Sequence, residues 1–445
     1  MKRMMIVFVI GFSMPLFLRA QTDQNLTFGE AVKIALEKNV TLNQQKNQLE
    51  ANQAARMGAI ANHLPNLNAQ GSFQRQQGQQ PNTTNGNLED LITDYTGLYL
   101  NTNYTIFSGM GRLNTYSQTN HQLTAQGYLI KRSTQDVIFN VANQYLQVLL
   151  DQELLAIAKE NLASQVALLE QIQATYEVGS KAITDVYNQD ALVKAAEVTA
   201  IRARNTMQND KALLAQILQL EPQDTFTVVS PENRAFSAYV KLSVDSLTQL
   251  AISNRADLHQ SQELVKANKY SLKSAGSTYS PNLSVYANYG SFYYSLITNS
   301  YKDQFLNVNR SLTYGATLNI PIFSRYQTKT QRVTARVAYE NSMLTKENLE
   351  KTVKIDVIRA MNNFHNAQEA YQSSLAQFKA GELSLQTQEE SYSLGISSFV
   401  ELADARRTYV QGAGSKAQAE VTLIFQRVLL EYALGTLSIE DLSAQ

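Results

Sequence analysis

The chain has 445 residues, with 38 Lys and Arg against 38 Asp and Glu, and it contains no Cys. The lack of Cys excludes disulfides, thiolate metal sites and Cys nucleophiles. A formal net charge of zero provides no basic surface for nucleic acid, which is therefore not an expected partner. Charged residues make up 17% of the chain, against roughly 25% in an average soluble domain, so its surfaces are expected to be polar but mostly uncharged.

The start of the chain has the features of a secretory signal peptide. Two basic residues precede an apolar run from Met4 to Leu18, and polar residues follow Ala20. A membrane anchor needs about 20 apolar residues, more than this run provides. We therefore expect residues 1–20 to be removed and residues 21–445 to form the mature protein. No later segment holds 18 consecutive apolar residues, so any membrane crossing is expected to use strands.

The sequence repeats itself at an offset of 216 residues without a gap. Residues far apart in the first copy all find matching residues in the second: Pro65 matches Pro281, Phe107 matches Phe323, Tyr176 matches Tyr392, and Gly179 matches Gly395. We expect one domain built from two repeats, 26–222 and 242–438, joined by a linker over residues 223–241. Each repeat is expected to contain a helix, two strands with a loop between them, a very long helix, a tight turn and a last helix.

Long helices are indicated by the absence of proline and by heptads. No proline occurs between Pro81 and Pro222 or after Pro321, and a helix interior excludes it. Apolar residues recur every seven positions from Val141 to Tyr176, and again at the matching places in the second repeat. This period favours coiled-coil packing. A helix over about 109–178 would reach roughly 105 Å at 1.5 Å per residue, and shorter helices are expected over about 30–62 and 185–219 of the first repeat.

Four segments alternate apolar and polar residues with period two, as strands with two unlike faces do. They have about the length of transmembrane strands, and their alternating runs carry no charge. Long polar loops are expected over 76–96 and 291–310. An ordinary sheet of a soluble protein would alternate in the same way, so the pattern alone leaves both interpretations open. The expected strands cover residues of about 66–75, 96–107, 282–291 and 310–321.

Membrane strands in this number require several chains. Four strands cannot close a barrel, and an open edge cannot lie in lipid. Two chains would give eight strands with a filled interior, and three would give twelve strands with a lumen. The smallest arrangement that forms a pore is therefore a trimer.

The residues now point to a known family. The relevant motifs occur along the whole mature chain: Leu26-Thr27-Phe28-Gly29-Glu30-Ala31 at its start, Leu64-Pro65-Asn66-Leu67 before the first strand, Ile106-Phe107-Ser108-Gly109 after the second, and the turn sequences Tyr176-Glu177-Val178-Gly179 and Tyr392-Ser393-Leu394-Gly395. In these motifs and in its duplication the chain resembles the TolC-like outer membrane efflux proteins of Gram-negative bacteria.

The resemblance implies a mainly α-helical protein with a membrane β-barrel part. Three chains would share a twelve-stranded barrel in outer membrane lipid, and their coiled-coil helices would form an α-barrel tunnel in the periplasm. The implied function is an outer membrane channel, a passive export duct of a tripartite efflux pump or type I secretion system. Its implied partners are a periplasmic adaptor (membrane fusion) protein and an inner-membrane transporter.

The resemblance also implies where the adaptor docks. In the family, the turns that follow the long helices form the periplasmic end of the tunnel. The matching residues are Gly179 and Ser180 in the first repeat and Gly395 and Ile396 in the second. Glycine suits such turns because it accepts a positive φ at the end of a helix.

A periplasmic gate of acidic residues is implied just after the second turn. The matching positions are Glu401 and Asp404, which are three apart and so lie on one helix face, and Asp185 is the counterpart of Glu401 in the first repeat. Threefold repetition would make rings of carboxylates, which attract cations. The alternative is that Asp185 and Glu401 simply complement the dipole at a helix N-terminus. Some relatives carry a basic residue two places after the turn glycine, where this chain has Ser397.

The sequence contains no recognisable catalytic or cofactor site. No phosphate-binding glycine loop, G-x-S-x-G motif or H-E-x-x-H motif occurs. The four histidines are spread along the chain without the spacing of metal ligands, at His63, His121, His259 and His365. We therefore expect no enzyme, no cofactor and no bound metal. The alternative to an export duct is a secreted coiled-coil protein with a structural or adhesive role.

Overall fold

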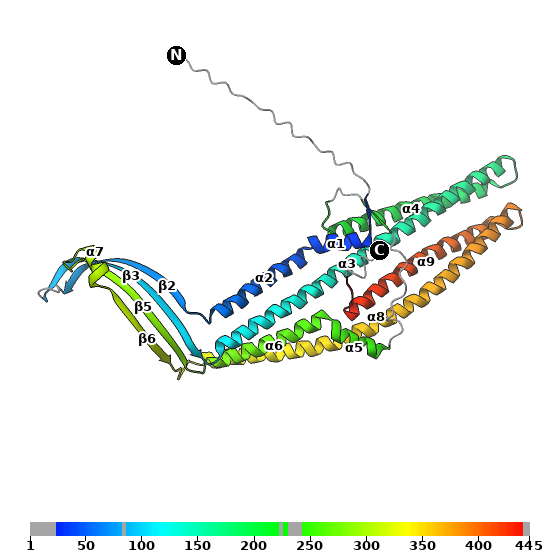
Figure 1. Ribbon diagram of the computed structural model, residues 1–445. Coiled ribbons are helices and arrows are strands. Elements are labelled where there is room, and N and C mark those ends of the chain that lie inside the picture. The colour runs from blue at the N-terminus through cyan, green and yellow to red at the C-terminus, as the bar shows by residue number, and fades with distance from the viewer. Residues whose placement is uncertain (1–23, 82–85, 222–225, 230–242, 439–445) are drawn as a thin grey trace, which may run out of the picture.

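A computed structural model describes residues 24–81, 86–221, 226–229 and 243–438. The expected signal peptide lies outside these residues, as does the expected linker apart from residues 226–229. The molecule is elongated, with a curved sheet at one end and two helical turns at the other (Figure 1).

The helices of the two halves follow the same order at an offset of 216 residues. Each half begins with two short helices, which are α1 (Phe28–Lys38) and α2 (Val40–Ala61) in the first and α5 (Val244–Asn254) and α6 (Ala256–Ser277) in the second. A long helix of 67 residues follows the strands, α3 (Gly111–Glu177) and α8 (Gln327–Ser393). Each half ends in one more helix, α4 (Ile183–Ile217) and α9 (Phe399–Leu434).

The single helix expected over residues 30–62 is wrong, because the chain forms two helices there. α1 ends at Lys38, and Asn39 begins α2 by accepting the N–H of Leu42 on its side-chain oxygen at 2.9 Å. An Asn side chain satisfies a helix N-terminus in this way, and it thereby competes with a continuous helix. Arg255 occupies the equivalent break between α5 and α6.

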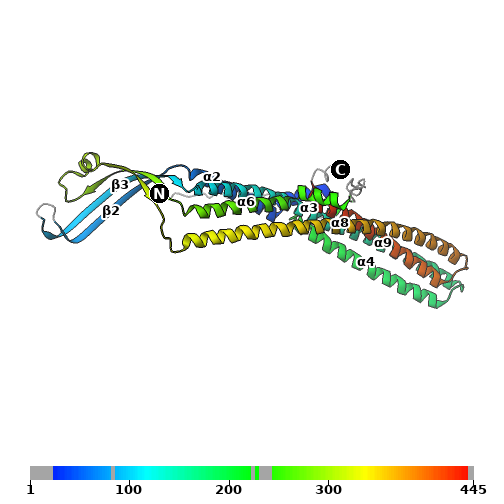
Figure 2. The same cartoon turned by 90° about the horizontal axis from the view of Figure 1, so that it is seen from below.

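The helices pack side by side along the molecule. Next to the sheet, α2 packs on α3, α3 on α6, and α6 on α8. Toward the turns, α4 packs on α3 and α9 packs on α8, so that two helical pairs run to the far end (Figures 1 and 2). α3 also contacts α9, which joins the two pairs.

The main hydrophobic core lies at the middle of the long helices. There α1, α3 and α4 meet a small parallel sheet of β1 (Gln24–Leu26) and β4 (Phe226–Val228). Tyr145 of α3 is completely buried, and its hydroxyl lies 2.8 Å from the carbonyl oxygen of Leu26 and 2.7 Å from that of Val229. These bonds fix the ends of the small sheet to α3. A second cluster joins α5, α8 and α9 around Leu247, Val357 and Leu430.

The strands form one antiparallel sheet in the order β2, β3, β5, β6. Their bounds are β2 (Asn66–Pro81), β3 (Leu88–Ser108), β5 (Asn282–Tyr294) and β6 (Ser311–Asn319). The loop expected over 76–96 is wrong, because the ladder of β2 and β3 continues until Pro81 pairs with Leu88. Backbone bonds hold this polar hairpin without apolar alternation, and an ion pair of Arg75 with Asp94 at 2.7 Å crosses it.

The connection from β5 to β6 is also ordered in part. It contains a short helix α7 (Tyr301–Asp303) and a π-helix η2 (Gln304–Val308). Gln304 is completely buried, and its amide donates to the carbonyl oxygens of Tyr294, Ile297 and Asn299. One polar side chain thus organises this loop.

Candidate functional site

The turns at the far end of the molecule are built around two glycines in the left-handed region. Gly179 has φ 75° and Gly395 has φ 73°. After α3, the N–H of Ser180 donates to the carbonyl oxygen of Thr175 at 2.9 Å, and after α8 that of Ile396 donates to Ser391 at 2.9 Å. These six-to-one bonds are Schellman caps, which end a helix and reverse the chain.

Large apolar side chains are exposed around both turns. Val178 is 79% exposed, and Ile396 is 77% exposed, with Leu394 and Val400 nearly as open. Directly beneath them a buried cluster of Ile172, Val186, Leu402 and neighbours holds all four helix ends together. The exposed apolar side chains are therefore held in place by the packed helix ends beneath them.

A cation also connects the two turns. The ammonium of Lys181, in the first turn, lies 4.3 Å from the centre of the Tyr392 ring at the end of α8. Attraction between a cation and an aromatic face stabilises such a contact. This contact could not be predicted from the sequence, because the two residues lie in different repeats.

Glu401 and its counterpart Asp185 do not have the same surroundings. Glu401 forms a capping box with Ser398, whose N–H donates to the Glu401 carboxylate at 2.7 Å. These bonds lower the pKa of Glu401, which therefore stays ionised. Asp185 also stands in the first turn of its helix, but Ala182 at the N-cap of α4 provides no side-chain cap.

Asp404 lies one turn after Glu401 and is exposed. It forms an ion pair with Arg407, one further turn along α9. Both side chains line a groove of about 560 Å³ between α9 and the helices α3 and α4, together with Val400 and Gln411. The charge of Asp404 is thus offset within its own helix, whereas among the described residues Glu401 has the hydroxyl and the backbone N–H of Ser398 as its hydrogen-bond partners.

The sheet at the other end has two unlike faces, both open. Along each strand the apolar residues fall on one face, where they are exposed: Leu67 73%, Leu98 56%, Leu312 63% and Tyr314 77%. The opposite face carries Asn, Gln, Ser, Thr and Tyr. Exposed apolar surface of this extent marks contact with lipid or protein.

Both edges of this sheet lack a partner among the described residues. β2 pairs with β3 alone, and β6 pairs with β5 alone. Each edge therefore presents a row of backbone N–H and C=O groups to its surroundings.

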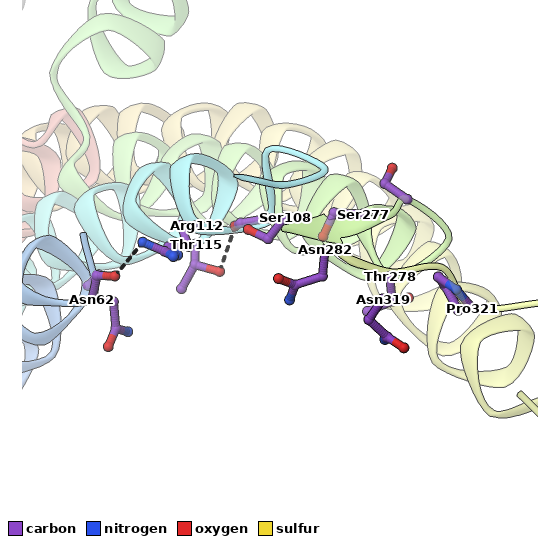
Figure 3. A pocket seen from close by; sticks show the side chains of 12 residues that line it. Asn62, Ser108, Arg112, Thr115, Ser277, Thr278, Asn282, Asn319 and Pro321 are labelled. Atoms are coloured by element: carbon purple, nitrogen blue, oxygen red, sulfur yellow. Dashed lines mark hydrogen bonds between the residues drawn. The ribbon is translucent and has the colours of Figure 1, made fainter. Parts of the chain in front are cut away.

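A polar pocket of about 400 Å³ lies where the helices meet the sheet (Figure 3). Arg112 at the start of α3 donates to the carbonyl oxygen of Asn62 at 2.8 Å and to that of Thr105. Its guanidinium thus links the end of α2 to β3 through two hydrogen bonds. Asn282 and Asn319 of the neighbouring strands line the same pocket.

Sequence reasoning missed a pair of carboxyl groups in the helical wall. Asp151 of α3 is almost completely buried and interacts with Asp210 of α4. Burial and the nearby Asp210 raise the pKa of Asp151 to about 7. The two residues are distant in sequence, and only the packing of α4 on α3 brings them together.

The described residues contain neither a metal-binding cluster nor a membrane-spanning helix. No three His, Asp or Glu side chains gather there as metal ligands. Within the same residues, no helix combines the length and apolar character needed to cross a membrane.

The fold and these sites define a class of protein. Long helices end in exposed apolar turns, and a small sheet has an exposed apolar face and two open edges, as in a subunit of a membrane channel. The model of the outer membrane efflux protein family matches residues 31–219 and 247–436, and the chain belongs to this family. It is accordingly an outer membrane protein from a family of transport channels rather than enzymes. The two matched segments begin 216 residues apart.

Named relatives agree with the family. The chain is 27% identical to the outer membrane protein TolC of Vibrio cholerae over 314 residues, 69% of each chain. It is 24% identical to TolC of Escherichia coli over 319 residues, which cover 70% of this chain and 63% of that protein. The chain thus spans less than two-thirds of the Escherichia coli protein.

Solved structures share the fold at low identity. The Campylobacter jejuni CmeC outer membrane channel matches with a TM-score of 0.82 and 16% identity, over 93% of this chain and 88% of the other. The outer-membrane channel OprN matches with a TM-score of 0.79 and 19% identity, over 92% and 90%.

The buried carboxyl pair predicts a pH dependence of stability. The pKa of Asp151 is about 7 in the folded protein and about 4 in an unfolded chain. As pH rises between these values, the unfolded state releases a proton that the folded state keeps, so stability falls over this range and is level above it. Asp151→Asn removes this part of the fall, because the amide carries no charge at any pH.

The measurement is the thermal unfolding midpoint of the helices, followed by circular dichroism at several pH values. Asp190→Asn, on the exposed side of α4, is the matched control and keeps the pH profile of the wild type. Identical profiles for Asp151→Asn and the wild type would contradict the prediction.

Proposed function

We propose that this chain is one of three identical subunits of an export duct in the outer membrane. The duct passively conducts substrates that a periplasmic adaptor and an inner-membrane transporter deliver. The observation that carries this proposal is the sheet, with its exposed apolar face and two edges that are unpaired among the described residues. In lipid each unsatisfied backbone group costs several kcal/mol, so the edges must meet other chains.

The geometry favours three chains. Twelve strands give a barrel wide enough for a lumen, and the polar face of each sheet then lines it. The long helices continue from the same strands and extend the lumen into the periplasm. A secreted coiled-coil protein, the alternative, has no use for so large an exposed apolar sheet face.

The duplication predicts how neighbouring subunits pair. Within one chain β3 pairs with β5, and Asn101 lies opposite Asn288. Shifting each residue by one repeat gives Thr317 on β6 opposite Ser72 on β2 of the next subunit. Both residues lie on the polar face, so two Cys side chains there would be close enough for a disulfide.

The test is the double variant Thr317→Cys with Ser72→Cys in this chain, which has no Cys of its own. Oxidation in the outer membrane should join subunits into covalent trimers, and light scattering of the detergent-extracted particle should give three chains. Thr317→Cys with Phe73→Cys, on opposite faces, is the control and should stay uncrosslinked. A disulfide that joins Thr317→Cys to Gln70→Cys or Gln74→Cys instead would keep the barrel but change its register. A monomer without any crosslink would overturn the shared barrel.

We propose that the far end of the helices forms a cation-attracting gate. Glu401 is ionised and has no cation partner among the contacts of its capping box. Asp404 contributes less, because Arg407 offsets its charge. Asp185 adds a carboxylate from the first repeat. Threefold repetition places such groups in rings around the lumen.

Glu401→Gln is expected to lower the preference of the channel for cations, because it removes the uncompensated charge of each subunit. Ser398→Ala is the matched control, since it breaks the same capping box but keeps the carboxylate. The measurement is the reversal potential of single channels in a planar bilayer under a salt gradient. Equal shifts in both variants would mean that Glu401 serves only as a helix cap.

We propose that the turns at Gly179, Ser180, Gly395 and Ile396 dock the adaptor. The exposed apolar side chains around them favour this, because apolar surface gains most from being covered by a partner. The positive φ of both glycines keeps the turns tight enough to enter a groove.

Ile396→Asp should prevent docking while the trimer still assembles, because the side chain is 77% exposed and supports no core. Val198→Asp is the control, at a half-exposed position midway along α4. Adaptors that copurify from crosslinked cells are identified by mass spectrometry and compared between the variants. Unchanged adaptor recovery with Ile396→Asp would contradict docking at this turn.

A further inference from the structure

Three glycines of the sheet lie directly beneath tyrosine rings. A Cβ built on Gly315 would come within 2.7 Å of the Tyr286 hydroxyl and 2.9 Å of its Cζ. One built on Gly290 would lie 2.8 Å from Cε1 of Tyr99, and one on Gly97 would lie 2.6 Å from Cε2 of the same ring. Real Cβ atoms do not approach other atoms so closely, so a larger residue at these positions would have to displace the tyrosine ring that covers it.

The pairs follow from the register of the strands. Tyr99 of β3 lies opposite Gly290 of β5, and Tyr286 of β5 lies opposite Gly315 of β6. Each tyrosine thus covers the glycine of the following strand. An aromatic ring that covers a glycine across two strands shields its backbone and stabilises the pair.

These tyrosines all belong to the polar face of the sheet. They are half-buried because their rings lie flat against the sheet. The hydroxyls of Tyr95 and Tyr99 form a hydrogen bond with each other. On the apolar face the situation differs. Tyr314 is 77% exposed, and a Cβ on Gly71 would meet nothing within 4 Å.

The two repeats have diverged in a complementary way. Tyr99 and Gly315 occupy the same position, 216 residues apart. At this position the first repeat therefore has a tyrosine that covers a glycine, whereas the second repeat has a glycine that a tyrosine covers. The equivalent of Tyr286 in the first repeat is Gln70, so no tyrosine of β2 covers a glycine of β3, whereas tyrosines cover glycines between β3 and β5 and between β5 and β6.

We propose that Gly290 and Gly315 are seats that hold Tyr99 and Tyr286 flat against the wall, and that these seats set the free width of the barrel lumen. This inference rests on the proposed function, in which the polar face lines the lumen. Without the seats, three copies of each ring would turn inward. Glycine at these positions is thus a determinant of the size of cargo that leaves the duct.

Gly315→Ala is the best variant, because the added methyl group meets the flexible end of Tyr286 rather than backbone. The ring should lift into the lumen while the strands keep their pairing. Gly71→Ala, on the apolar face, is the matched control. Gly315→Ala combined with Tyr286→Ala removes the displaced ring and should restore the width.

Access through the barrel is measured with Thr317→Cys, a unique thiol two residues beyond Gly315 toward the helices. Two reagents are added outside whole cells: a small charged methanethiosulfonate and a maleimide carrying a large polyethylene glycol. With Gly315→Ala the large reagent should react several-fold more slowly, and the small one at an unchanged rate. This readout does not depend on the state of the periplasmic gate.

The outcomes distinguish failure of the proposed seats from failure of the proposed duct. Equal rates of the large reagent in Gly315→Ala and Gly71→Ala, in correctly assembled protein, would overturn the seats. Failure of Tyr286→Ala to restore the rate would also overturn them. If Thr317→Cys reacts with neither reagent, or reacts no better than Leu318→Cys on the opposite face, the polar face does not line a lumen. In that case the proposed function itself fails.

Discussion

The backbone groups at the two edges of the sheet are the constraint on which the proposed duct depends. β2 and β6 each pair on one side only within the described chain. Water satisfies such an edge in a soluble protein, but lipid does not. In the proposed duct the sheet would become stable in a membrane only when chains complete one another, and the number of chains would fix the lumen. The helices would then share the symmetry of the barrel, because each long helix follows a strand after a turn with positive φ at Met110 and Tyr326.

The two repeats share the same backbone conformation but differ in many of their side chains. Helix bounds and turn conformations recur at an offset of 216 residues, down to the φ of 66° at Met110 and 63° at Tyr326. Many side chains at matching positions nevertheless differ. Asp151, with its raised pKa, corresponds to Ala367 in the second repeat. In a trimer the backbone would have nearly sixfold symmetry, whereas charge and ring positions would repeat only three times.

Features with a regular period could be predicted from the sequence, and features that depend on contacts could not. Heptads located α3 and α8, and alternation located the sheet, because burial of one face imposes these periods on the sequence. The break at Asn39 was missed, since an Asn within a helical pattern reveals its capping bond only when the turn is built. The extension of β2 to Pro81 was missed, because a hairpin held by backbone bonds and one ion pair needs no apolar pattern. At the proposed gate, the sequence located Glu401 and Asp404 but not their different partners, Ser398 and Arg407.

The difference between these partners decides how the proposed periplasmic end works. The charge of Asp404 is offset by Arg407, and the buried Arg406 is paired with Glu389 across α8 and α9. Recognition there would depend on apolar side chains such as Ile396 and Val400, which surround the turns. A partner that covers them would gain free energy without breaking ion pairs within the chain. Glu401 would then act on the ions that pass rather than on the closure of the gate.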